Sequence, residues 1–451
     1  MRTSGRIRTD AYFDHVNPQW VKLLSLLEMN VSYECCLGTE LYTADGRRIL
    51  DFLSGYCVHN IGHNHPTLVS ALKAELDKTG PVMLQTNVPE LAGELAERLC
   101  GLAGGRISKV FFASSGSEGI QTAIKFARAN TGRTGLLACE RAFHGLTCGA
   151  LSLTDGEYWR KGFGPLLPET ALVPFGDLNA LEKELASGRY AAFFVEPIQS
   201  EGGVRVPGEH YLREAQGLCR RTGTLMVADE VQTGMFRTGP FLASHHFDIQ
   251  PDVVVLAKAL SGGLVPVSAV LMSDDVHQSV FTSFKRSIVH ASTFSENSLS
   301  MRAGLATLNV LQSERLGERA IELGAQLREQ LTEALLGYEM VKDIRGKGML
   351  SGIEFTAPQR LTLRVPFEAF AKIHAAMFGQ ILVMRLFRDS GILTQICGNN
   401  FMVLKVAPPL VATASQLAEF VAAVRRVVDL AHHPGPFWSE ALGLAGRALA
   451  S

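Results

Sequence analysis

The sequence lacks several features that would place the protein in a broad class. No apolar stretch reaches the roughly eighteen residues that a membrane-spanning helix needs. The 43 basic and 44 acidic residues nearly cancel, so charge indicates no surface for nucleic acid or lipid headgroups. Arg2, Arg6 and Arg8 near the start are not followed by an apolar segment, which argues against a secretory signal.

Metal-binding and nicotinamide-binding patterns are also missing. The 8 cysteines form no CxxC pair, so neither a zinc site nor a disulfide framework is indicated, and scattered thiols fit a cytoplasmic location. His59, His63 and His65 resemble a metal cluster, but we interpret GHNHP (62–66) as a turn motif and expect no metal site. No GxGxxG follows an early strand, which argues against a Rossmann-type dehydrogenase.

The middle of the chain contains short apolar runs separated by helical patterns. Their apolar character is continuous, which favours strands buried on both faces of a parallel sheet. The runs occupy residues 109–114, 191–197, 225–230, 252–258 and 267–273. After the first run, Ile120, Ala123, Ile124 and Ala127 have the spacing of one helical face. The pattern predicts an α/β domain with a mostly parallel sheet.

The two ends of the chain have a different character. Residues 344–355 alternate like a strand, and residues 413–428 indicate an amphipathic helix that begins with a capping box at Thr413 and Gln416. We therefore predict a large domain over residues 76–329 and a smaller domain built from residues 1–75 and 330–451. No role is assigned to the tail at 432–451.

Polar residues follow the apolar runs at the positions where ligands bind in open α/β sheets. Ser114 to Ser117 follow the first run, and this Gly/Ser loop suits either a phosphate or an ordinary helix cap. Glu196, Asp229 and Lys258 follow three other runs. Lys258 alone could extend to water. A phosphate cradle, an acid and a lysine at neighbouring strand ends instead indicate pyridoxal phosphate.

Several motifs, in this order, resemble one family. They are FFASSGSEG (111–119), AFHG (142–145), VEPIQSEGGV (195–204), VADEVQTGMFRTG (227–239), VVVLAKALSGG (253–263), STF (292–294) and VLKVAPPL (403–410). Over residues 35–430 the chain resembles class III, or ω-, aminotransferases, which are fold-type I pyridoxal-phosphate enzymes. Putrescine, ornithine, acetylornithine and 4-aminobutyrate aminotransferases are the similar members. The resemblance implies a large domain with a seven-stranded, mostly parallel sheet, a smaller α+β domain, and a homodimer with shared active sites.

The resemblance also implies roles for individual residues. Lys258 would form the Schiff base with the cofactor, which cycles through its pyridoxamine form, and would shuttle the proton. Asp229 would pair with the ring nitrogen and Gln232 with the ring hydroxyl, while Thr293 would reach the phosphate of the neighbouring subunit. The remaining implied cofactor contacts are Ser115, Gly116, Ser117, Phe143, His144, Glu196 and Val231.

The sequence departs from the family at positions that would contact substrate. Leu146 stands where several relatives have an arginine for a substrate carboxylate, so we expect a donor without a carboxylate there, unless Arg141 or Arg302 compensates. Lys405 replaces another arginine, and with Glu201 it forms either a carboxylate switch or a structural ion pair.

Two further features bear on the substrate. TFSENSLS (293–300) lacks the two glycines and the proline that are usual in this loop, and this indicates altered specificity. Tyr56 is either a contact at the substrate entrance or a core residue.

The predicted function is a ping-pong transfer of an amino group between a primary amine, diamine or ω-amino compound (or the matching aldehyde) and a 2-oxo acid. The alternative is an aminomutase or racemase on the same fold.

Overall fold

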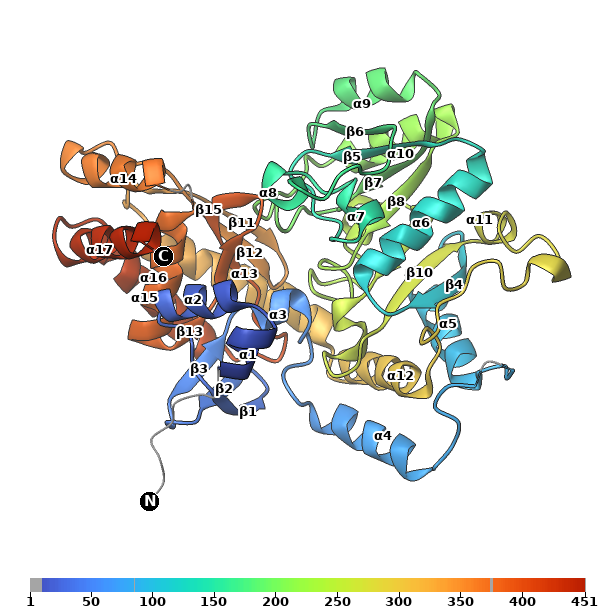
Figure 1. Cartoon of the computed structure of the whole chain (residues 1–451), viewed down its shortest axis with the longest axis horizontal. Helices are drawn as coiled ribbons and strands as arrows, with labels where there is room; N and C mark the ends of the chain where they lie inside the picture. Colours follow the sequence, from blue (N-terminus) through green and yellow to red (C-terminus); the bar gives the residue numbers. More distant parts are fainter. Residues whose placement is uncertain (1–9, 85, 374–375, 451) are drawn as a thin grey trace.

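The computed structural model describes residues 10–84, 86–373 and 376–450. Arg2, Arg6 and Arg8 lie outside them. The middle of the chain forms one half of the molecule, and both chain ends lie together in the other half (Figure 1). Within the described ranges, no helix is long and apolar enough to cross a membrane.

A seven-stranded sheet organises the larger half. Its strands, in spatial order, are β4 (Ile107–Ala113), β10 (Ser268–Ser273), β9 (Val253–Leu256), β8 (Leu225–Asp229), β7 (Tyr190–Val195), β5 (Gly135–Cys139) and β6 (Thr170–Val173). Only β10 runs antiparallel to its neighbours, and the other pairs are parallel. The predicted mostly parallel α/β sheet is confirmed.

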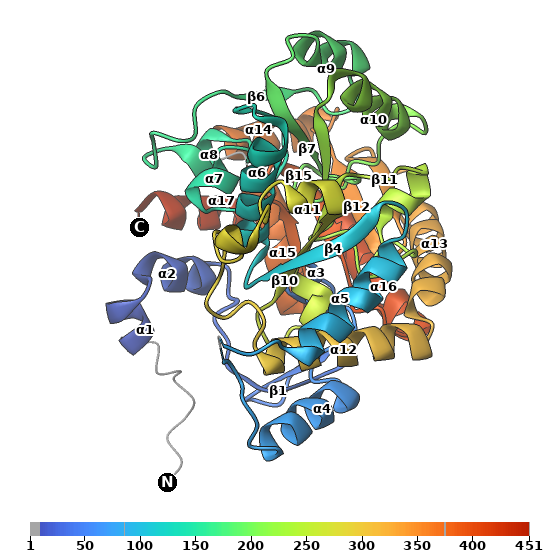
Figure 2. The same cartoon turned by 90° about the vertical axis from the view of Figure 1, so that its right-hand side faces the viewer.

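Helices cover both faces of this sheet (Figure 2). They are α4 (Pro66–Asp77), α5 (Glu90–Ala103), α6 (Gly116–Thr131), α7 (Cys148–Leu151), α8 (Glu157–Arg160), α9 (Leu178–Leu185), α10 (Tyr211–Thr222), α11 (Asp274–Gln278) and α12 (Ser298–Ser313), with short 3-10 turns η1 (Ala243–Phe247), η2 (Lys258–Ser261) and η3 (Phe284–Arg286).

The apolar runs are continuous because successive strand residues enter different cores. Val253 and Val255 belong to the cluster that contains Ile120 of α6, whereas Val254 belongs to the cluster that contains Leu95 of α5. Side chains of a strand alternate between faces, so a sheet that is buried on both sides needs apolar residues at every position.

The smaller half has two four-stranded sheets. One has the order β1 (Tyr33–Leu37), β2 (Glu40–Thr43), β3 (Arg48–Asp51) and β13 (Ile392–Leu393), and the other has the order β11 (Val341–Lys347), β12 (Leu350–Phe355), β15 (Asn400–Val406) and β14 (Gln395–Cys397). The helices outside the large half are α1 (Asp10–His15), α2 (Pro18–Leu26), α3 (Ser54–Cys57), α13 (Leu316–Ala334), α14 (Leu361–Ile373), α15 (Met377–Ser390), α16 (Ala414–Ala431) and α17 (Pro436–Ala450).

One detail differs from the sequence expectations, one agrees, and the domain boundaries stay predictions. Residues 344–355 form a hairpin rather than one strand, because the chain turns at Gly348, whose φ is +53°. The predicted domain boundaries, after residues 75 and 329, fall within helices α4 and α13. These boundaries stay predictions. The capping box of Thr413 and Gln416 is present at the start of α16.

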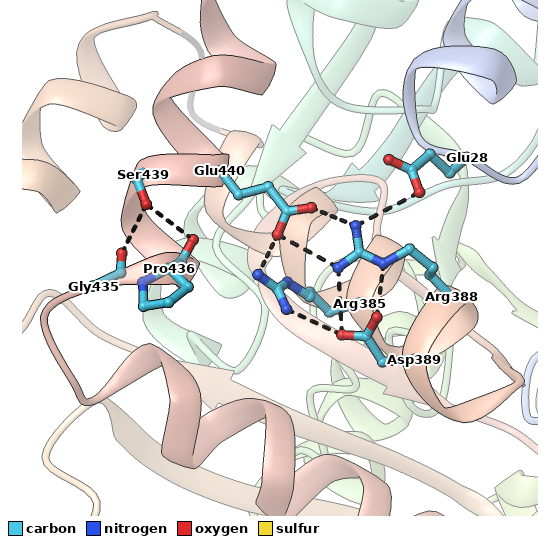
Figure 3. A network of polar contacts seen from close by, with 8 residues as sticks. All are labelled: Glu28, Arg385, Arg388, Asp389, Gly435, Pro436, Ser439 and Glu440. Atoms are coloured by element: carbon cyan, nitrogen blue, oxygen red, sulfur yellow. Dashed lines mark hydrogen bonds and ion pairs between the residues drawn. The ribbon is translucent and has the colours of Figure 1, made fainter.

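The tail that carried no sequence assignment forms α17, which is joined to α15 by ion pairs (Figure 3). Glu440 binds both Arg385 and Arg388, and Arg388 also lies 3.6 Å from Glu28, just after α2. The two ends of the chain are thereby linked through one helix of the smaller half.

Candidate active site

The predicted strand ends meet around one cavity of about 470 Å³ at the carboxyl edge of the large sheet. This volume is typical of small-molecule sites. The predicted residues that line it are Ser115, Gly116, Ser117, Phe143, His144, Glu196, Asp229, Val231, Gln232 and Lys258. Ser114 and Val58 also line the cavity. Val58 was not predicted from the sequence as a site residue.

The loop between β4 and α6 forms one wall of the cavity. Ser115 caps α6 by accepting a hydrogen bond from the Glu118 N–H at 3.3 Å. The first N–H groups of a helix have no intrahelical partner, and they attract anions. A Cβ on Gly116 would lie 3.1 Å from Val231, and one on Gly145 would lie 2.0 Å from the Ser117 hydroxyl. The wall therefore suits a phosphate that approaches the backbone closely.

Asp229 is held in place at the end of β8. Its Oδ1 accepts a hydrogen bond from the Val231 N–H at 3.0 Å, and its Oδ2 lies 2.8 Å from Nδ1 of His144. Burial alone would lower the pKa of His144, but the hydrogen bond and charge of Asp229 raise it above its ordinary value. This leaves a carboxylate with fixed orientation in the cavity wall.

Glu196 is a second buried acid, at the end of β7. It accepts hydrogen bonds from the N–H groups of Phe143 and Ser200, both at 3.1 Å. Burial raises the pKa of Glu196 to about 7. Glu196 thereby fixes the backbone of the loop that carries Phe143.

Lys258 begins the turn η2, directly after β9, with a φ of +46°. Asp229 pairs with Val255 on the neighbouring parallel strand, so the acid and the lysine lie at the same sheet edge. Burial lowers the pKa of Lys258, which favours the neutral, nucleophilic amine. An anion cradle, an oriented acid and a desolvated lysine in one cavity are the groups that pyridoxal phosphate requires, so these residues fit that cofactor.

The predicted substrate residues Glu201, Lys405 and Tyr56 lie next to this cavity. Lys405 is fully buried and forms an ion pair with Glu201, and its Nζ lies 4.8 Å from the centre of the Tyr56 ring. Gln232 donates a hydrogen bond to Glu201 at 3.1 Å, which connects the pair to the cavity wall.

The pair is strongly coupled. Burial would raise the pKa of Glu201, but the Lys405 ammonium holds it below its ordinary value. Burial would likewise lower the pKa of Lys405, and the Glu201 carboxylate raises it instead. Both groups are therefore charged near neutral pH.

Leu146, Thr293 and the two arginines lie outside the set that lines the cavity. Leu146 is 52% exposed, and its N–H donates to the Ser117 hydroxyl at 3.2 Å, so it adjoins the cradle. Thr293 is exposed. Arg302 pairs with Glu75 at 3.0 Å, and Arg141 lines a different cavity beside the β11–β12 hairpin.

The three histidines of the early loop have other contacts. His63 lies 2.7 Å from Asp51, its ring stacks on His59 with centroids 3.9 Å apart, and His65 lies 3.1 Å from Glu314. Within the described residues, no group of three or more histidine, cysteine or acidic residues is arranged to hold a metal ion.

Sequence reasoning missed Trp159 and Asn399. The Trp159 ring meets the Phe143 ring edge-on with centroids 5.2 Å apart, and its indole N–H donates to Asn399 at 2.7 Å. Neither residue belongs to a motif that we recognised. Trp159 lies in the larger half with Phe143, whereas the contacts of Asn399 depend on the packing of the smaller half against the larger one.

Comparison with known proteins places the chain in a family. The model of the family described as Aminotransferase class-III matches residues 26–428. The chain therefore belongs to the class-III aminotransferase family, as the sequence motifs predict.

Individual relatives agree with this assignment. Aminotransferase PigE from Serratia sp. (strain ATCC 39006) is 36% identical over 93% of this chain. The match covers 53% of PigE, so this chain spans about half the length of that protein. The ornithine aminotransferase of Toxoplasma gondii superposes with a TM-score of 0.79 at 29% identity, covering 94% of this chain and 98% of the other. A PLP-bound amine transaminase from an uncultivated Pseudomonas species has a TM-score of 0.80 at 29% identity, with coverages of 89% and 95%. These names do not favour the aminomutase alternative.

Proposed function

We propose that the protein is a pyridoxal-phosphate-dependent aminotransferase whose donor is a primary amine, diamine or ω-amino compound, or whose acceptor is the matching aldehyde. This substrate would carry no carboxylate at the position beside the phosphate cradle. The observation that carries this proposal is Leu146. Its backbone N–H donates to the Ser117 hydroxyl, so the residue adjoins the cradle, and a leucine side chain cannot bind a carboxylate there. Arg302 is paired with Glu75 and Arg141 lines another cavity, which argues against compensation by either cation.

The roles of the cavity residues follow from their chemistry. When bound, pyridoxal phosphate supplies an aldehyde and an electron-accepting ring. Lys258 would hold the cofactor through its amine and move the proton at the reacting carbon, since burial favours its neutral form. Asp229, oriented by Val231 and His144, would keep the ring nitrogen protonated. Phe143 and Val231 would enclose the ring, and Ser115 to Ser117 would bind the phosphate.

The second substrate would be a 2-oxo acid that meets Lys405. When Glu201 turns away, the Lys405 ammonium would become free for a carboxylate. Lysine lacks the planar fork of the arginine found in relatives, so this carboxylate would be held by one charge rather than by paired hydrogen bonds. Tyr56, whose ring faces Lys405, would border the same subsite.

A homodimer with shared sites is part of this proposal. Thr293 is exposed and does not line the cavity of its own chain. In a dimer its hydroxyl would bind the cofactor phosphate in the partner subunit. The cytoplasmic location stays a prediction.

The donor proposal is tested by single-turnover absorbance of the loaded protein with one amine at a time and no acceptor. We expect hexylamine, putrescine and cadaverine to convert the bound cofactor faster than ornithine, 4-aminobutyrate or glutamate. The variant L146R should gain rate with 4-aminobutyrate and lose rate with hexylamine, each by about tenfold, since a guanidinium–carboxylate pair contributes on the order of 1–3 kcal/mol. Rapid conversion of wild type only by ornithine or 4-aminobutyrate would contradict the proposal.

A further inference from the structure

The hairpin turn between β14 and β15 reaches from the smaller half into the candidate active site. The N–H of Gly398 donates to the Glu201 carboxylate at 2.9 Å, and the N–H of Asn399 donates to the Glu201 carbonyl at 2.9 Å. The backbone of this turn therefore helps to hold the carboxylate that pairs with Lys405.

The side chain of Asn399 contacts the loop that carries Phe143. Its Nδ2 donates to the carbonyls of Ala142 at 3.0 Å and Arg141 at 3.2 Å, while its Oδ1 accepts the indole N–H of Trp159 at 2.7 Å. One amide thus uses both its donors and its acceptor. An aspartate could not donate to the two carbonyls.

The indole of Trp159 occupies a slot that two glycines keep open. A Cβ on Gly398 would lie 3.1 Å from Trp159 Cζ2, and a Cβ on Gly156 would lie 3.3 Å from Trp159 Cδ1. The ring meets Phe143 edge-on at an interplanar angle of 71°. Because Asn399 takes up the N–H, which is the only polar group of the indole, the rest of the ring presents apolar atoms.

We propose that Trp159, held by Asn399, is a specificity-determining residue that forms an apolar wall beyond Phe143 for the carbon chain of the amine. Asn399 is the positioning residue, and its turn joins this wall to the Glu201 carboxylate. The inference rests on the proposed function and adds the class of donor, namely an amine with an extended apolar chain.

The test is a chain-length profile. Single-turnover rates with n-alkylamines from ethylamine to octylamine should rise with length in wild type. In W159A we expect octylamine to lose at least tenfold and ethylamine less than threefold. W159F keeps a ring but not the N–H, so it should fall between wild type and W159A. N399A should lose rate with long amines more than with short ones, as W159A does, while the backbone of residue 399 still holds Glu201.

The matched control is W20F, the same exchange at an exposed residue of α2, which should keep the wild-type profile. A second readout is independent of turnover, namely tryptophan emission on addition of 1-hexanol, a non-reacting chain analogue. The emission should change in wild type and W20F and not in W159F.

The outcomes separate the two proposals. If wild type converts alkylamines but W159A and W159F keep its chain-length profile, the role of Trp159 is wrong and the proposed function stands. If wild type converts only donors that carry a carboxylate, both proposals are wrong.

Discussion

At the scale of residues, Glu201 and Lys405 form a buried ion pair beside the cavity. Lys405 is fully buried, and Glu201 receives further hydrogen bonds from Gln232 and Gly398. Desolvation of two charges is costly, and the pair persists because each charge is compensated by the other and by these donors.

Removal of one partner should therefore be costly. We expect K405M to lower the free energy of unfolding by about 3–5 kcal/mol, because the Glu201 carboxylate would remain buried without its counter-charge. The double variant E201Q/K405M should lose less than the sum of the two single variants. Urea denaturation of all variants measures these differences.

The matched control is K161M, the same exchange in a pair that is about 80% exposed on both sides, Lys161 82% and Glu157 84%. Its effect should stay within about 1 kcal/mol. Equal decreases in the free energy of unfolding for K161M and K405M would show that burial of the Glu201–Lys405 pair does not affect stability.

At the scale of elements, the strands of the large sheet were the most predictable part. Five apolar runs became strands, since a sheet that is buried on both faces requires continuous apolarity. Two strands, β5 and β6, were not among the predicted runs. Helix α17 was also missed, since its attachment depends on Arg385 and Arg388 of a distant helix, which no local pattern specifies.

The attachment of α17 yields a prediction. In E440Q the ion pairs that Glu440 forms with Arg385 and Arg388 lose their charge (Figure 3), so amide exchange across residues 436–450 should accelerate by an amount equivalent to about 1–3 kcal/mol. Hydrogen exchange followed by mass spectrometry measures this, and β8 and β9 should keep their protection.

The neighbouring variant S439A is the control. Among the described residues, the Ser439 hydroxyl bonds to the carbonyls of its own turn, Gly435 and Pro436, so exchange in α17 should stay at the wild-type rate. Identical exchange in E440Q and wild type would mean that apolar packing alone holds the helix.

At the scale of the whole molecule, a buried arginine joins the two halves. Arg237 follows the Asp229 strand, and it donates to the Met349 carbonyl at 3.1 Å, to the Pro408 carbonyl, and to Asn60 at 2.5 Å. It therefore links the large half to both the early and the late parts of the smaller one. The motif containing Arg237 was recognisable in the sequence, but these partners were not.

The same distinction applies to the candidate site. Residues at strand ends, such as Asp229 and Lys258, could be predicted because parallel strands bring their carboxyl ends to one edge. Trp159 and Asn399 could not, because their contact arises only when a hairpin of the smaller half packs on the larger half. The family motifs in the sequence predicted the candidate cofactor contacts. The proposed specificity residue Trp159 and its partner Asn399 could be identified only from the tertiary packing.

The central claim is that Lys258 carries the cofactor in this cavity. Borohydride reduction of the loaded protein, followed by proteolysis and mass spectrometry, tests it most directly, because reduction makes a lysine–cofactor bond permanent. We predict that the added mass lies on the peptide containing Lys258 and that K258A retains none. Covalent mass on another lysine, or equal labelling of K258A, would contradict the account.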